Sequence, residues 1–250
     1  MTLFPMTKHF LRVMVYYKVN FIFSFGVPLV SIIYSLRKYI FRHPEQKETI
    51  ELIIFWISYM IVLYALMDSG SALVRLREEQ FLKMFLFISR NKWKVIMARF
   101  FSHLIVLTAS AVLFDLIASI LFSLPFGTLL GITAVMICVC VIPVYSLFLL
   151  FAALPFRQET IQPIVNLLIF FFLIITLNHF SGTTTFFNVL LLLTNPMNYA
   201  FDVGLTFLSF LSSNDAPPVS WLLLLLISCI YLIIGFVSII NMKILPIFRN

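Results

Sequence analysis

Charged residues are scarce in this sequence. Asp, Glu, Lys and Arg together make up 11% of the 250 residues, whereas hydrophobic residues make up 62%. Soluble domains are usually about half apolar and about one quarter charged. A chain of this length cannot hide so much apolar surface in its own core, so lipid must cover the rest. The composition therefore predicts an all-α, polytopic membrane protein.

Glycine is also scarce, with only 7 residues, and no stretch of the chain reads G-x-x-x-x-G-K-[ST]. That motif builds the phosphate-binding loop of many ATPases. We therefore expect this chain to bind no cofactor and to be no enzyme. If the function of this protein uses ATP, another chain must bind and hydrolyse it.

Cysteine gives no sign of a metal site or a disulfide, because Cys138, Cys140 and Cys229 lack the spacing of either. The net charge of +7 could suggest nucleic acid. Basic residues beside apolar spans are, however, what orientation in a membrane requires. We expect neither a bound metal nor a nucleic-acid partner.

Six apolar stretches have the length of about 20 residues that a helix needs to cross the hydrocarbon layer. These predicted spans are 19–36, 51–70, 97–122, 128–154, 161–180 and 219–240. Pro28 and Pro143 lie inside two of them, where proline removes a backbone hydrogen bond. We therefore predict kinks near both prolines.

The 17 Lys and Arg residues are distributed unevenly over the loops. Only four lie in the loops on one side of the predicted bundle, namely Arg37, Lys38, Arg42 and Lys47. The others lie in the two termini and in the loops after the second and fourth spans. Because cytoplasmic loops carry the excess of Lys and Arg, both termini are expected in the cytoplasm.

Two segments beside the spans have helical patterns of their own. Residues 7–18 place apolar side chains at helical spacing against basic ones, a pattern typical of a helix that lies in the membrane interface. Residues 186–211 contain two apolar runs, separated by Asn195 and Pro196, that are too short to cross. We predict two short re-entrant helices on the outer face, because irregular backbone at membrane depth must be covered by protein.

The most charged part of the chain is 73–94, in which apolar and charged residues alternate at helical period. Arg75, Glu79 and Lys83 follow one another at four-residue steps, so opposite charges can meet along one face. The candidate functional residues of this segment are Arg75, Arg77, Glu78, Glu79, Phe81, Lys83, Phe85 and Arg90.

Three ionisable residues lie within or at the end of spans, where charge is costly and often functional. Asp115 lies deep in the third span, His103 precedes it in the same span, and Asp68 lies at the cytoplasmic end of the second. For each, two interpretations stay open. The side chain either lies on a substrate path or forms a polar contact at a subunit seam.

Glu78 and Glu79, followed by Lys83, are similar to the E-E-x-x-x-R signature of intramembrane CAAX-type proteases. Such chemistry needs His ligands that face the glutamates within the bilayer, and only His103 lies near. A protease-like enzyme and an ion-coupled secondary transporter are the alternative functions. A secondary transporter usually shows inverted repeats or midplane ion ligands.

The order of these parts resembles the ABC-2 type transporter permease family over nearly the whole chain. An amphipathic helix precedes a first span with an internal proline, and segment 75–90 contains an acidic pair, a leucine-rich turn and Ser-Arg. Arg99 then opens the third span, and Asn195-Pro196 precedes the last. Gln80 stands where many members have Gly, and we expect it to make the segment more helical.

The resemblance implies that 73–94 is a cytoplasmic coupling helix seated in a separate ATP-binding subunit. Two copies of that subunit would carry ATP and magnesium. A second permease subunit, identical or related, would enclose the path within a bacterial plasma membrane. The apolar, Phe-rich spans suit amphipathic or hydrophobic cargo, such as the toxin or antimicrobial peptides handled by exporters of phenol-soluble modulins.

Overall fold

The structure is a computed structural model that describes residues 3–16, 22–40, 46–178, 185–212 and 217–242. The end of the predicted interfacial helix (17–18), the first residues of the first span (19–21) and the last of the fifth (179–180) lie outside these ranges. All regular secondary structure in the described ranges is helical.

The helices follow one another with short connections. In chain order they are α1 (Leu3–Tyr16), η1 (Ile22–Gly26), α3 (Val27–Ser35), η2 (Arg37–Tyr39), α4 (Gln46–Ala65), η3 (Leu66–Ser71), α5 (Ala72–Glu78), α6 (Phe81–Ser89), α7 (Lys92–Phe122), α8 (Phe126–Phe148), α9 (Leu150–Ala153), α10 (Gln158–Leu177), α11 (Thr185–Thr194), α12 (Pro196–Ser212) and α13 (Trp221–Asn241). The segments η1 and η3 are π-helical, and η2 is a 3₁₀ turn.

Five continuous helices in the described residues are long and apolar enough to cross a membrane. They are Gln46–Glu78, Lys92–Phe122, Phe126–Ala153, Glu159–Leu177 and Trp221–Asn241. These helices coincide with the second to sixth predicted spans. The chain is therefore an all-helical, multi-pass membrane protein.

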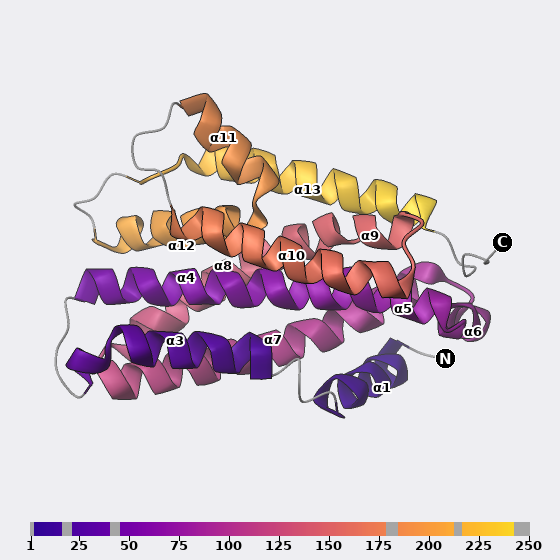
Figure 1. Ribbon diagram of the computed structural model, residues 1–250, viewed down its shortest axis with the longest axis horizontal. Coiled ribbons are helices and arrows are strands. Elements are labelled where there is room, and N and C mark those ends of the chain that lie inside the picture. Colours follow the sequence, from indigo (N-terminus) through magenta and orange to yellow (C-terminus); the bar gives the residue numbers. More distant parts are fainter. Residues whose placement is uncertain (1–2, 17–21, 41–45, 179–184, 213–216, 243–250) are drawn as a thin grey trace.

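The first predicted span is described only as the shorter apolar segment Ile22–Ser35. Pro28 lies in the first turn of α3, directly after the π-helical turn η1, and the backbone is helical from one to the other through Gly26. Figure 1 shows α1 at one end of the bundle and η2 at the other, with η1 and α3 between them. Pro143 lies inside α8.

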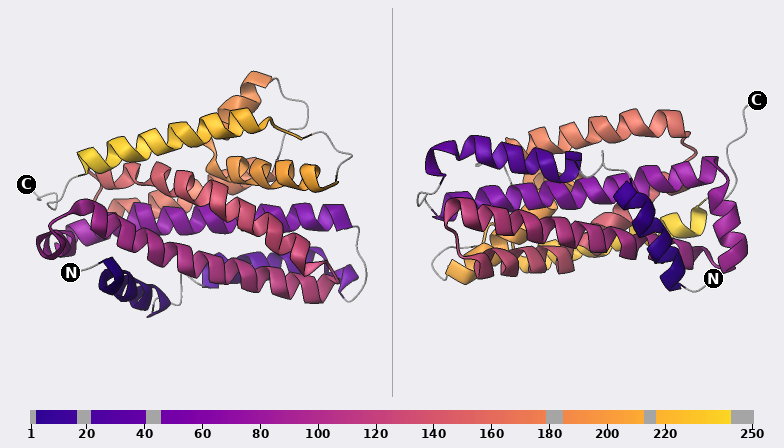
Figure 2. Two further views of the ribbon diagram at one scale, coloured as in Figure 1. Left: turned by 180° about the vertical axis from the view of Figure 1, so that it is seen from behind. Right: turned by 90° about the horizontal axis from the view of Figure 1, so that it is seen from below.

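The helix formed by α4, η3 and α5 lies at the centre of the bundle (Figures 1 and 2). Within the chain, 83% of its most apolar part is buried, whereas the other four long helices bury between 22% and 44% of theirs. It packs against α7, α8 and α12. A helix that is apolar around its whole circumference belongs in such an interior position.

The two ends of the bundle differ in what they contain. α1, α5, α6 and the last turn of α13 lie at one end, here called the α6 end (Figure 1). Lys92 Nζ donates a hydrogen bond of 3.0 Å to the carbonyl oxygen of Ile240, which joins the start of α7 to the end of α13 there. The first turns of α4 and α8 lie at the opposite end.

Segment 73–94 is not one helix. α5 continues the central helix to Glu78, the chain turns at Gln80, and α6 follows. Gln80 has a φ of 62°, a left-handed conformation that ends a helix and that glycine adopts at less cost. The expectation that Gln80 makes this segment more helical was therefore wrong.

The two short helices predicted for 186–211 are present as α11 and α12, and Asn195 separates them. The side chains of 185–187 and 212 lie outside the described set. α12 packs against α4 and α8, so this hairpin reaches the core of the bundle and is not a surface loop.

Candidate functional site

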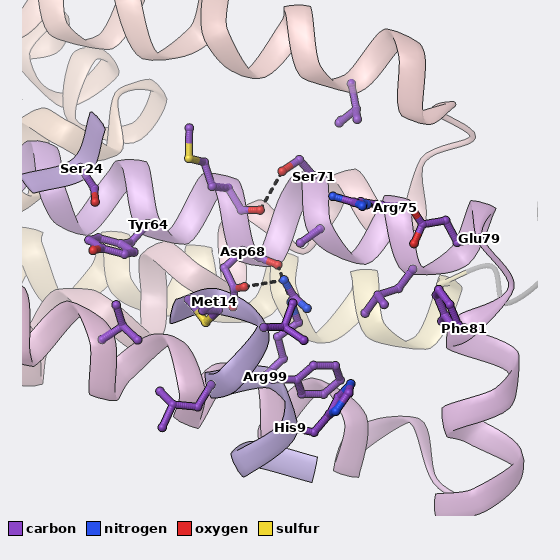
Figure 3. A pocket seen from close by; sticks show the side chains of 18 of the residues that line it. His9, Met14, Ser24, Tyr64, Asp68, Ser71, Arg75, Glu79, Phe81 and Arg99 are labelled. Carbon is purple, nitrogen blue, oxygen red and sulfur yellow. Dashed lines mark hydrogen bonds and ion pairs between the residues drawn. The ribbon is translucent and has the colours of Figure 1, made fainter. Parts of the chain in front are cut away.

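A partly open cavity of about 1880 Å³ runs along the half of the bundle nearest α6 (Figure 3). Its walls come from α1, η1, the central helix, α6, α7 and the start of α10. Farther from α6 the walls are largely apolar, with Leu63, Val106 and Leu113 among the lining residues. Toward α6 the lining includes Arg75, Glu78, Glu79, Arg157 and Glu159. The cavity therefore has an apolar part and a charged part.

The wall between these two parts contains a buried ion pair. Arg99 Nη2 of α7 lies 2.7 Å from Asp68 Oδ1, and Arg99 Nε donates a hydrogen bond of 3.3 Å to the backbone carbonyl of Asp68 (Figure 3). The Arg99 guanidinium also lies 5.2 Å from the centroid of the Phe10 ring on α1. The structure therefore places Asp68 on the cavity wall, with a partner in the same chain.

His103 and Asp115 do not line the cavity. The His103 ring is fully buried between those of Tyr64 and Tyr145, at centroid distances of 5.8 Å and 5.4 Å. Neither ring nitrogen of His103 and neither carboxylate oxygen of Asp115 has a hydrogen-bond partner among the described residues. Of the three ionisable candidates, only Asp68 reaches the cavity.

Arg77 was expected to contact a partner subunit, but its side chain is only 1% exposed. Its Nη1 donates hydrogen bonds of 3.2 Å and 3.0 Å to the carbonyls of Ala152 and Leu154, and Nη2 donates to the carbonyl of Phe156. Carbonyls at the end of a helix have no intrahelical partner, and here the guanidinium supplies one. The assignment of Arg77 to a docking surface was therefore wrong, because it fixes α5 to the end of α9.

Phe85 is also buried, at 7% exposure. Its ring packs against those of Phe10 and His9 on α1, at centroid distances of 5.2 Å and 5.8 Å. Phe85 therefore holds α6 against α1 and is not available to a partner subunit, which corrects its predicted role.

The remaining candidates of this segment are accessible. Arg75 and Glu79 form the predicted ion pair, with Nε and Oε1 2.8 Å apart, while Glu78 pairs with Arg77. Lys83 and Arg90 are exposed beyond the turn. Four apolar side chains of α6 are more than 40% exposed, namely Phe81, Met84, Phe87 and Ile88. Of these, only Phe81 is among the candidates predicted from the sequence. The spacing of Phe81, Met84 and Ile88 at three and four residues is the signal that defines this face.

Asn195 has a structural role in the α11–α12 hairpin. Its Oδ1 accepts the N–H of Met197 at 3.0 Å, which caps α12 directly before Pro196. Its Nδ2 lies within hydrogen-bond distance of the Phe172 carbonyl and the Thr176 hydroxyl of α10, at 3.2 Å and 3.1 Å. This residue therefore fastens the hairpin to α10.

Asp202 of α12 is not among the candidates chosen from the sequence. It is 4% exposed, and its Oδ1 has no hydrogen-bond partner among the described residues. Burial raises the pKa of this carboxyl to about 7. The signal that was missed is its place on the same helical face as Asn198 and Tyr199, which are also buried.

The arrangement of the acidic residues gives no support to the protease alternative. Glu78 and Glu79 each pair with an arginine, and His103 is buried on a different helix. No three His, Cys, Asp or Glu side chains gather as metal ligands within the described part of the chain.

No protein-family model matches this chain. No curated protein matches it either. The likeness to ABC-2 permeases therefore rests on the order and spacing of its motifs.

Proposed function

We propose that this chain is the transmembrane subunit of an ATP-driven exporter of the ABC-2 type. Its cavity would form half of a path for amphipathic cargo. The observation that carries this proposal is the cavity itself, which combines a long apolar wall with a charged part near α6.

The chemistry of the lining favours an amphipathic cargo of low net charge. Several charges near α6 are already matched, because Arg75 pairs with Glu79 and Arg99 with Asp68. A strongly charged ligand would find little uncompensated charge there. An apolar body, such as the face of an amphipathic toxin or antimicrobial peptide, would contact the apolar wall.

A second permease subunit, identical or related, would close the open side of the cavity. α10 contributes to its wall, yet α10 buries only 22% of its most apolar part within this chain. The exposed apolar surface of α10 would then contact lipid or the second subunit.

The exposed face of α6 suits docking into a protein groove. An apolar stripe on a helix is the usual ligand of such a groove. We assign the groove to an ATP-binding subunit, present in two copies, that carries ATP and magnesium. The α6 end would then face the cytoplasm of a bacterial cell with both termini, Ile22–Ser35 would belong to the first of six spans, and α11–α12 would be re-entrant from the outer face.

Purification of the tagged chain from its native membrane tests this proposal. A co-purifying P-loop ATPase is expected, and Phe87→Ser should abolish its retention because Phe87 is 86% exposed on α6. Phe210→Ser is the matched control, since Phe210 is 73% exposed on α12, and Figure 1 shows α12 far from α6. Equal retention by both variants would contradict the docking assignment. ATP-independent transport by the chain alone would contradict the exporter class.

One observation favours an ion-coupled secondary transporter as the second candidate. Asp115 and Asp202 are buried carboxyl groups with unpartnered oxygens, and such groups inside a bundle often mark proton relays. Transport in vesicles that have a proton gradient and no ATP would select this alternative.

A further inference from the structure

The central helix contains one irregular turn. Between α4 and α5, the segment η3 (Leu66–Ser71) is π-helical. A π-helical turn forms i→i+5 hydrogen bonds, so it holds one residue more than an α-helical turn, and such turns are frequent at functional sites. Asp68 and Ser71 belong to this turn and line the cavity.

Both flanks of η3 are fixed. Most of α4 is buried in the core, and α5 is held by the hydrogen bonds from Arg77 to Ala152 and Leu154. Neither flank can rotate to release the extra residue. The π-helical turn can still move along the helix, and each residue that it passes then turns by about 100° around the helix axis.

Arg99 holds the turn in its present place. Ser69 and Ser71 donate hydrogen bonds to the carbonyls of Ala65 and Met67 within the same helix, at 2.6 Å and 2.7 Å. Arg99 comes from α7 and binds both the carboxylate and the backbone carbonyl of Asp68. Among the described residues, Arg99 is therefore the hydrogen-bonding partner that ties η3 to another helix, while η3 also packs against α8, α9 and α10.

The same arginine is connected to α6. Its guanidinium lies over Phe10 of α1, and the Phe10 ring packs edge-on against Phe85 of α6 at 5.2 Å. Ser102 Oγ donates a hydrogen bond of 2.8 Å to the carbonyl of Thr7, which ties α1 to α7 one turn from Arg99. Packed side chains therefore form an unbroken path from the cavity wall to α6.

We infer that η3 is a two-position switch whose register is set by the Asp68–Arg99 pair. With the pair formed, the π-helical turn stays at Leu66–Ser71. With the pair broken, the turn moves along the central helix, Asp68 rotates away from Arg99, and the freed guanidinium releases Phe10 and α6. The link from cavity occupancy to α6 rests on the proposed function, whereas the register change concerns this chain alone.

Cysteine accessibility in lipid nanodiscs tests the register directly, in a background with Cys138→Ala, Cys140→Ala and Cys229→Ala. Met67 is half-buried and lines the cavity, whereas Ser69 is fully buried. A small polar maleimide should modify Met67→Cys and spare Ser69→Cys. Adding Arg99→Gln should raise the modification rate of Ser69→Cys at least tenfold and lower that of Met67→Cys.

Two controls separate a register change from loosening of the fold. Ser58→Cys on α4 is fully buried and should stay unreactive when Arg99→Gln is added. Deletion of Met67 removes the extra residue and leaves one α-helical register, so Arg99→Gln should then leave Ser69→Cys unreactive. The inference would be overturned if Ser69→Cys stayed unreactive when Arg99→Gln is added to the full-length chain. It would also be overturned if Arg99→Gln raised the modification rate of Ser58→Cys equally. Because no ATPase is present, either result is independent of the exporter proposal.

Discussion

Buried charges near the α6 end have partners, whereas those in the other half of the bundle do not. Arg77 binds three carbonyls and Glu78, and Arg99 binds Asp68. Asp115 and Asp202 each keep at least one oxygen without a partner among the described residues. Charge therefore fastens helices together near α6, while polar contacts in the far half come from amide and hydroxyl groups.

Removal of Arg77 should lower the stability of the protein most, because Arg77 has the most partners among the buried charges near α6. Arg77→Met leaves the buried carbonyls of Ala152 and Leu154 without their guanidinium donor, which should cost about 3 kcal/mol of unfolding free energy. Arg75→Met is the control, because the Arg75–Glu79 pair is exposed and should cost less than about 1 kcal/mol. Thermal unfolding in detergent measures both, and equal losses would contradict the role of Arg77.

Asp68→Asn should have the next largest effect, about 2 kcal/mol, since it leaves the Arg99 guanidinium buried without a counter-charge. The double variant Asp68→Leu with Arg99→Met removes both charges and should recover most of this loss. If the double variant unfolds at a lower temperature than Asp68→Asn, the ion pair does more for the fold than neutralise two buried charges.

Asn195→Ala should test the amide hydrogen bonds that join helices in the half of the bundle away from α6. Loss of the α12 cap and of the hydrogen bonds to α10 should cost about 1 to 2 kcal/mol. Asn166→Ala is a suitable control, because Asn166 is an exposed residue of α10. Faster amide hydrogen exchange in residues 196–212 of Asn195→Ala alone would confirm the anchoring role.

Asp202→Asn should cause no loss of stability, and its effect on stability should depend on pH. The pKa of Asp202 in the folded protein is about 7, against 3.8 ordinarily, so the unfolded chain ionises first as pH rises. Wild-type stability should therefore fall between about pH 4 and pH 7 through this group, and Asp202→Asn should remove that fall. Parallel stability curves for the two proteins over this range would contradict the burial of an unpartnered carboxyl group.

Composition and hydropathy predicted the fold well because length and apolarity are properties of each segment alone. The five long helices and the break at Asn195 follow from such local patterns. The limits of the first span are harder to predict, since Pro28 and the basic residues after it interrupt its apolar pattern.

The roles of the candidate residues were harder to predict, because they depend on partners distant in sequence that local patterns do not reveal. Arg77 looked like a surface residue beside Arg75, but the carbonyls that bury it lie about 75 positions later. Phe85 and Phe81 have the same chemistry, and only the position of α1 separates the buried ring from the exposed one. Gln80 was misjudged because helix propensity says nothing about a turn imposed by the helices on either side.

The sheltered position of the central helix has a consequence for assembly. Helices of membrane proteins insert as separate segments before they associate, so α4 meets lipid on every side before α7, α8 and α12 arrive. Its all-round apolar surface serves insertion first and packing second. A polar substitution on α4 can thus fail during biosynthesis, in the translocon, even where the finished bundle would supply a hydrogen-bond partner.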